Sequence, residues 1–213
     1  MGENGPIRIV CFDLGGVIIR IHYTWEDTCK SVGLAVRKEA HEPKRLAATR
    51  SVTEAFATGR LEEDLWAREM VSALDGLYSA EEVERIHEGW LRDQYPGIDD
   101  VVSILNETKG VCTACLSNTN PRHWRMMKER YPAVRMLQHR HASHLMGYAK
   151  PDTGIYEAFE TAMQCDGPSI LFFDDLEDNV AAARSRGWHA HQIDPAGDPA
   201  DQVRTCLASY GLM

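Results

Sequence analysis

Carboxylates directly follow two strongly apolar stretches of this chain. Asp13 follows the run 7–12, and the pair Asp174 and Asp175 follows the run 169–173. If both runs are strands that end at the same edge of one sheet, these carboxylates converge and repel one another. A hard divalent cation bound through oxygen atoms removes that repulsion. Such a cation attracts phosphate, so the pattern indicates metal-assisted chemistry at a phosphate group.

Three further polar side chains occupy comparable places. Ser117 and Asn118 follow the apolar run 111–116, and Lys150 lies in the loop GYAKPDTGIY, which glycine and proline bound. Each of these residues alone is commonly a turn or cap residue, or a solvated charge. Because ligands of open α/β sheets bind beyond the carboxyl ends of the strands, the whole set predicts a binding site there.

The elements that must position these residues alternate between strand and helix. Apolar runs at 7–12, 111–116, 169–173 and, more weakly, 189–193 are typical of buried parallel strands. Helical patterns separate the later runs: PRHWRMMKERY, TGIYEAFETAM and EDNVAAARSRG. This alternation predicts an α/β fold with a Rossmann-like, doubly wound parallel sheet.

Residues 21–97 differ, because no strand pattern is found there and helix starts recur. S-x-x-E capping boxes begin at Ser51 and at Ser79. A core-facing stripe of apolar side chains falls at four-residue spacing: Trp66, Met70 and Leu74. We therefore expect residues 1–20 and 98–213 to form the catalytic core, with 21–97 as a small inserted helical cap.

Composition excludes several classes of function. The formal net charge of -9 argues against a nucleic-acid or anionic-membrane partner, since both need clustered Lys and Arg. The N-terminal segment lacks a basic region followed by a long apolar one, and no apolar run approaches the roughly 20 residues that span a bilayer. Six cysteines without a secretion signal indicate reduced thiols. We expect a cytoplasmic protein that acts on a small molecule.

Taken together, the motifs resemble those of the haloacid dehalogenase-like hydrolase superfamily, nearest to its glucose-1-phosphatase-like subgroup. Asp13 stands in FDLGGV, Ser117 in LSNTN, Lys150 in KPDTGIY, and Asp174 and Asp175 in FFDDLEDN. Their order and spacing match over both halves of the core. The segment between the halves resembles the family's inserted cap in position and kind.

The resemblance implies a Mg²⁺-dependent phosphomonoesterase whose nucleophile is Asp13, which forms an aspartyl phosphate. Asp13, the backbone carbonyl of Gly15 and Asp175 would hold the Mg²⁺ ion. Asp174 would either ligate the ion through water or orient a ligand from behind.

The resemblance also assigns roles around the transferred phosphate of a small metabolite such as a sugar phosphate. Ser117 would donate a hydrogen bond to the phosphoryl group, and Lys150 would neutralise its charge. Asn118 would position the nucleophile or the substrate. Three residues after the first strand either contact the substrate or pack within the cap: His22, Tyr23 and Trp25.

One position departs from the family pattern. Most phosphatases of the superfamily carry a second Asp two residues after the nucleophile, which protonates the leaving oxygen and later activates water, whereas this chain has Gly15. Placed proton donors typically contribute about 10²–10⁴-fold in rate. Three interpretations stay open: a phosphatase whose leaving group needs no such help; a weakened or inactive member that binds a phosphorylated ligand or a protein partner; and, less favoured, a dehalogenase-like hydrolase, which needs no metal.

Overall fold

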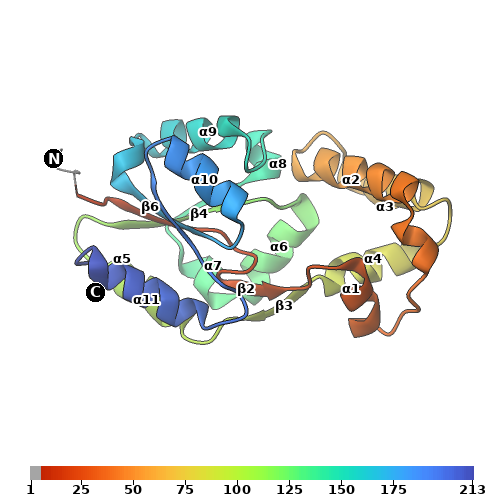
Figure 1. Cartoon of the computed structure of the whole chain (residues 1–213), viewed down its shortest axis with the longest axis horizontal. Coiled ribbons are helices and arrows are strands. Elements are labelled where there is room, and N and C mark those ends of the chain that lie inside the picture. The colour runs from red at the N-terminus through yellow and green to blue at the C-terminus, as the bar shows by residue number, and fades with distance from the viewer. Residues whose placement is uncertain (1–5) are drawn as a thin grey trace.

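The computed structural model describes residues 6–213, and its centre is a parallel sheet of five strands (Figure 1). The strands are β1 (Ile9–Phe12), β4 (Cys112–Ser117), β5 (His139–Ala142), β6 (Ile170–Asp174) and β7 (His189–Gln192). Their order is β5-β4-β1-β6-β7, and each neighbouring pair is parallel. The predicted Rossmann-like α/β fold is confirmed.

Helices cover both faces of this sheet (Figure 1). They include α5 (Ile98–Glu107), α9 (Thr153–Met163), α10 (Glu177–Ser185) and α11 (Pro199–Ser209). Val10 and Phe12 pack with α5 and α11 on one face, whereas Ile9 and Cys11 pack with α9 and α10 on the other. Alternate residues of a strand point to opposite faces, so a strand that is covered on both sides reads as one continuous apolar run.

A second group of helices, called the helical unit below, lies beyond the carboxyl ends of the strands (Figure 1). It consists of α1 (Trp25–Ser31), a short 3₁₀ turn (Lys38–His41), α2 (Pro43–Ala57), α3 (Glu63–Ala73) and α4 (Ala80–Gly89). It has its own hydrophobic cluster, in which the predicted stripe of Trp66, Met70 and Leu74 is buried. The capping box at Ser79 is confirmed.

Two expectations for this segment were wrong. Residues 21–97 do contain a strand, because β3 (Leu91–Gln94) pairs antiparallel with β2 (Ile19–Ile21) to form the two linkers of the helical unit. Both strands are too short, and β3 too polar, to show a period. Ser51 starts no helix, because α2 already begins at Pro43, whose fixed φ suits the first helical position.

The remaining elements connect the core. They are α6 (Pro121–Arg130), α7 (Pro132–Met136), α8 (Ser143–Met146) and a 3₁₀ turn (Gly167–Ser169). The sequence predicted α6 but not the edge strand β5, whose residues are mostly polar. Within residues 6–213, no helix combines the length and apolar character needed to cross a bilayer.

Two stacked histidines join the helical unit to the core. The rings of His87 in α4 and His123 in α6 lie 3.8 Å apart at 14°. His123 Nε2 lies 2.7 Å from the His87 carbonyl oxygen, so this nitrogen carries the proton. The Asn120 side chain, which also caps α6, lies 3.1 Å from His87 Nε2. The joint therefore buries two neutral imidazoles.

We expect the buried histidines of this joint to lower the stability of the protein as the pH falls from about 6.5 towards 4. Burial lowers the pKa of His123 to about 4, whereas an unfolded chain titrates near 6.5. At position 123 the unfolded state therefore binds more protons in this window, which lowers the free energy of unfolding by about 3 kcal/mol across it. Urea denaturation at a series of pH values measures the slope.

The variant His123→Gln should lose less stability than the wild type as the pH falls, whereas His87, whose pKa burial also lowers, contributes to the loss in both proteins. His139→Gln is the matched control, because His139 is exposed on β5 and its loss should leave the slope unchanged. Buried carboxyl groups with raised pKa values act in the opposite direction but are common to both proteins. Free energies of unfolding that change in parallel from pH 6.5 to 4 in wild type and His123→Gln would therefore contradict this account.

Candidate functional site

The predicted site residues gather at the carboxyl ends of three neighbouring strands. Asp13 directly follows β1, Ser117 ends β4, Asp174 ends β6 and Asp175 comes next. The Asp13 amide donates to the carbonyl of Phe173 at 2.8 Å, which fixes the residue against β6. The sheet topology thus brings together residues that are more than 150 positions apart.

Lys150 bridges two buried carboxylates. Its Nζ lies 2.9 Å from Asp13 Oδ1 and 2.6 Å from Asp174 Oδ2, and its side chain is 1% exposed. The ammonium also lies 5.3 Å from the centre of the Phe172 ring, whose face attracts a cation. One lysine therefore offsets the charge of both carboxylates.

Asn118 holds the main chain of Lys150. Its Nδ2 donates to the Lys150 carbonyl at 2.7 Å, and its Oδ1 accepts from the Lys150 amide at 2.8 Å. Both polar atoms of the Asn118 side chain are engaged, so Asn118 positions Lys150 rather than the expected nucleophile, Asp13. Its expected contact with substrate stays a prediction.

Asp174 also uses both of its oxygens for protein contacts. While Oδ2 faces Lys150, Oδ1 accepts from the Leu176 amide and from Asn179 Nδ2, each at 2.9 Å. These contacts fix the start of α10 and the lysine together. Of the two roles left open for Asp174, these contacts favour orientation of a ligand from behind over ligation through water.

Asp175 is held from the other side by the first linker of the helical unit. Tyr23 Oη donates to Asp175 Oδ2 at 2.8 Å. Gly16 lies against both residues, since a Cβ there would be 2.5 Å from Asp175 Cγ and 2.6 Å from Tyr23 Oη. The φ of Gly16 is +77°, which also favours glycine. Sequence reasoning examined Gly15 and missed Gly16, although the doubled glycine was a signal.

Trp25 and His22, which were predicted together with Tyr23, have different surroundings. The Trp25 ring packs edge-on against Tyr78 in the helical unit, with centroids 5.6 Å apart, so the structure favours the packing alternative for Trp25. The His22 amide donates to the Trp90 carbonyl at 3.0 Å, which pairs the two linkers. Only Tyr23 of these three makes a hydrogen bond to a site carboxylate among the described residues.

The electrostatics of the site favour an added cation. Burial raises the pKa of Asp13 to about 7, although Lys150 opposes the rise. Burial also raises the pKa of Asp175, against the hydrogen bond from Tyr23. Burial disfavours the Lys150 charge, but Asp13 and Asp174 outweigh it, so the lysine pKa lies above its ordinary value. The cluster contains three carboxylates and one ammonium group, which leaves negative charge uncompensated.

The arrangement fits a hard divalent cation. One oxygen from each of Asp13, Asp174 and Asp175 lies within 4.8 Å of the others. Asp13 Oδ1 is buried and, despite the ion pair with Lys150, has no aligned hydrogen-bond donor in the part of the chain that the structure describes. Among the backbone hydrogen bonds of residues 6–213, none is accepted by the Gly15 carbonyl. Free oxygens in a negative environment are the ligands that such ions prefer.

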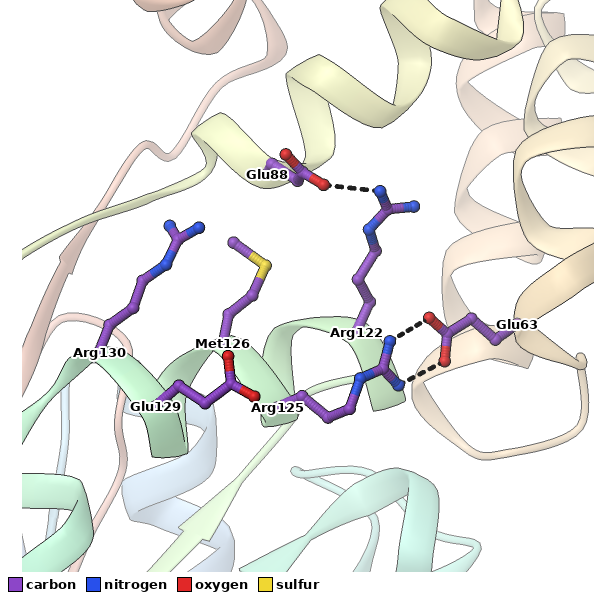
Figure 2. Close-up of a pocket in the computed structure, with 7 residues that line it drawn as sticks. All are labelled: Glu63, Glu88, Arg122, Arg125, Met126, Glu129 and Arg130. Atoms are coloured by element: carbon purple, nitrogen blue, oxygen red, sulfur yellow. Dashed lines mark hydrogen bonds and ion pairs between the residues drawn. The ribbon is translucent and has the colours of Figure 1, made fainter.

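A surface pocket of about 440 Å³ between the helical unit and α6 is separate from this cluster. Figure 2 shows two of its arginines paired with glutamates: Arg122 Nη2 lies 2.6 Å from Glu88 Oε1, and Arg125 Nη1 lies 2.6 Å from Glu63 Oε2. Asp13, Asp174 and Asp175 are not among the residues that line it. Because Arg122 and Arg125 are already engaged by acidic partners, we place the candidate functional site at the buried cluster.

Known proteins resemble this chain in sequence pattern. The pattern of the haloacid dehalogenase-like hydrolase family matches residues 7–187 and so includes every site motif. A phosphatase of Mycobacterium tuberculosis is 40% identical over 72 residues, which are 34% of this chain and 33% of that protein. The match thus spans about a third of the relative's length.

Solved structures resemble it over nearly the whole chain. A HAD family enzyme from Bacteroides thetaiotaomicron has a TM-score of 0.79 at 20% identity, covering 93% of this chain and 99% of that one. A complex of that enzyme with magnesium and inorganic phosphate has a TM-score of 0.75 at 20% identity, covering 90% and 96%. A HAD-like family hydrolase from Porphyromonas gingivalis has a TM-score of 0.76 at 24% identity, covering 94% and 98%. At these identities the likeness shows the fold.

Gly16→Ala should destabilise the protein more than the same substitution at another glycine that has a positive φ but open space around it. A left-handed conformation costs an alanine about 1–2 kcal/mol, and the new Cβ at position 16 must also displace Asp175 and Tyr23. Such overpacking typically adds about 1–3 kcal/mol. Urea denaturation at neutral pH measures the free energy of unfolding.

Gly110→Ala is the matched control, because Gly110 has a φ of +82° and a Cβ there meets no atom within 4 Å. It should show the backbone penalty alone. Equal losses at positions 16 and 110 would mean that the close approach to Asp175 is unimportant.

Proposed function

Because the chain belongs to the haloacid dehalogenase-like hydrolase family, we propose that it is a Mg²⁺-dependent phosphomonoesterase acting on a small phosphorylated metabolite. The observation that carries the proposal is the buried cluster of Asp13, Lys150, Asp174 and Asp175 at the strand ends. The helical unit, which lies beyond those ends, is proposed as the cap that selects the substrate.

Asp13, Asp175 and the Gly15 carbonyl would hold Mg²⁺. When bound, the ion would polarise a phosphate oxygen and offset the charge that develops during transfer. The magnesium and phosphate in the related Bacteroides structure support this choice of ion. So does the all-oxygen character of the cluster, because Mg²⁺ is bound through carboxylates together with substrate phosphates.

Asp13 acts as the nucleophile. Its carboxylate oxygen bonds to phosphorus while the bond from phosphorus to the leaving oxygen breaks, which leaves an aspartyl phosphate. Lys150, 2.9 Å away, favours the ionised form that attacks. Ser117, which ends β4, donates to the phosphoryl group. Water then attacks phosphorus, releases phosphate and restores Asp13.

The leaving group must depart without a carboxylic acid at position 15. A Cβ on Gly15 would lie 3.1 Å from Ile21 Cδ1, so an apolar side chain from β2 occupies the space beside this position. Substrates whose leaving oxygen is a weak base are therefore favoured, such as acyl phosphates, anomeric sugar phosphates and aryl phosphates.

The same glycine supports a second candidate function. Without the usual proton donor, the protein binds a phosphorylated ligand or a protein partner and turns over weakly or not at all. A dehalogenase-like activity is less favoured, because it requires no metal and the three-carboxylate cluster suits one.

A substrate panel tests the proposal. The Mg²⁺-loaded protein should release phosphate from acyl phosphates, sugar 1-phosphates or p-nitrophenyl phosphate, and release should stop on chelation. Asp13→Asn should lower the rate by at least about 10³-fold, since it removes the nucleophile. Phosphate release is followed colorimetrically.

Each alternative has its own outcome. Binding of Mg²⁺ and beryllofluoride with background turnover across the panel would favour the binding protein. Metal-independent halide release from 2-haloacids would favour the dehalogenase. Activity lost in Asp13→Asn with binding of inorganic phosphate retained would exclude the binding protein.

Restoring a carboxylate at position 15 should extend the substrate range. Gly15→Asp combined with Ile21→Ala, which removes the obstructing methyl, should raise turnover of alkyl phosphates by at least about tenfold, towards the 10²–10⁴ range of a placed acid. Ile21→Ala alone is the control. If the double variant and the control hydrolyse alkyl phosphates equally, the missing acid does not set the range.

A further inference from the structure

We propose that Tyr23 is a positioning residue that couples the metal site to the linker of the helical unit by holding Asp175. This inference rests on the proposed metal site, but not on turnover. It goes beyond the family pattern, because Tyr23 lies in the segment that leads into the helical unit and outside the four motifs.

The contact of Tyr23 is polar rather than one of ring packing. Its Oη donates to Asp175 Oδ2 at 2.8 Å, while the residue is 50% exposed. A half-exposed aromatic side chain gains only part of the free energy of full burial. The hydrogen bond to the carboxylate is the directional contact that fixes where the hydroxyl group lies.

The backbone leaves space for this contact. Gly16, in the turn between β1 and β2, approaches so closely that any Cβ would lie within 2.6 Å of both Asp175 and Tyr23 Oη. Three separate segments thus converge on one hydrogen bond. An incidental surface contact would not require a glycine at a positive φ beneath it.

Tyr23 also lies at the base of the helical unit. On one side, the His22 amide bonds to the Trp90 carbonyl at 3.0 Å and so joins the two linkers. On the other side, Thr24 caps α1 by accepting from the Asp27 amide at 3.0 Å. A shift of the helical unit relative to the core would move Tyr23, and with it the Asp175 carboxylate.

Two consequences follow from this placement. The hydrogen bond fixes the rotamer of Asp175 before an ion arrives, which removes part of the ordering cost of binding. Because coupling is reciprocal, an ion on Asp175 must in turn restrain the linker. Mg²⁺ affinity and linker order should therefore change together.

The variant Tyr23→Phe removes the hydroxyl group and keeps the aromatic ring, so it tests the hydrogen bond alone. The Mg²⁺ dissociation constant, measured by titration calorimetry on the full chain without substrate, should rise about 10- to 100-fold, as is typical when a partner of a metal ligand is removed. Tyr210→Phe is the matched control, because it removes a phenol that lies 3.0 Å from His191 Nε2. The control should bind Mg²⁺ as the wild type does.

Hydrogen exchange provides the second readout. In the wild type, Mg²⁺ should slow exchange of the His22 amide and its neighbours in the linker, and in Tyr23→Phe this protection should be lost at saturating Mg²⁺. Unchanged affinity in Tyr23→Phe, or equal protection in both proteins, would overturn the inference. A chain that binds Mg²⁺ as expected but releases no phosphate would overturn only the proposed phosphatase function, whereas a wild type that binds no Mg²⁺ would overturn both.

Discussion

The ammonium of Lys150, shared between Asp13 and Asp174, is the contact on which the rest of the site depends. Burying a carboxylate costs several kcal/mol unless an opposite charge and further hydrogen bonds compensate it. The chain supplies these through the Asn118 clamp on the Lys150 backbone and through the bonds from α10 to Asp174. Removing the lysine would leave two buried charges facing one another, so the strand ends, the loop and α10 form one electrostatic unit.

The sequence was informative where the position of a residue depends on a single helix or strand. Buried parallel strands have a continuous apolar pattern, so four of the five core strands and the carboxylates after them could be placed. The motif order also identified the family, and the match over residues 7–187 confirms it. Such motifs can be recognised in a sequence because a residue that directly follows a strand in the chain also lies at the end of that strand in the fold.

The contacts that the sequence did not reveal are those between segments that lie far apart in the chain. Asn118 contacts a backbone 32 residues away, and Tyr23 contacts a carboxylate 152 residues away. Neither pair leaves a periodic signal. Trp25 and Tyr23 are two positions apart and equally aromatic, yet one packs into the helical unit and the other bonds to Asp175. Short polar strands such as β3 and β5 are stabilised by their neighbours and lack a pattern of their own.

The pairing of β2 with β3 has a consequence for how such a protein changes over evolutionary time. The two ends of the helical unit leave the core side by side, joined by the bond from His22 to Trp90. Any insert with adjacent termini can replace it at small entropic cost, since loop closure depends only weakly on length. Recombination at this one junction can therefore exchange the proposed cap while the strands that carry the buried carboxylates are inherited intact.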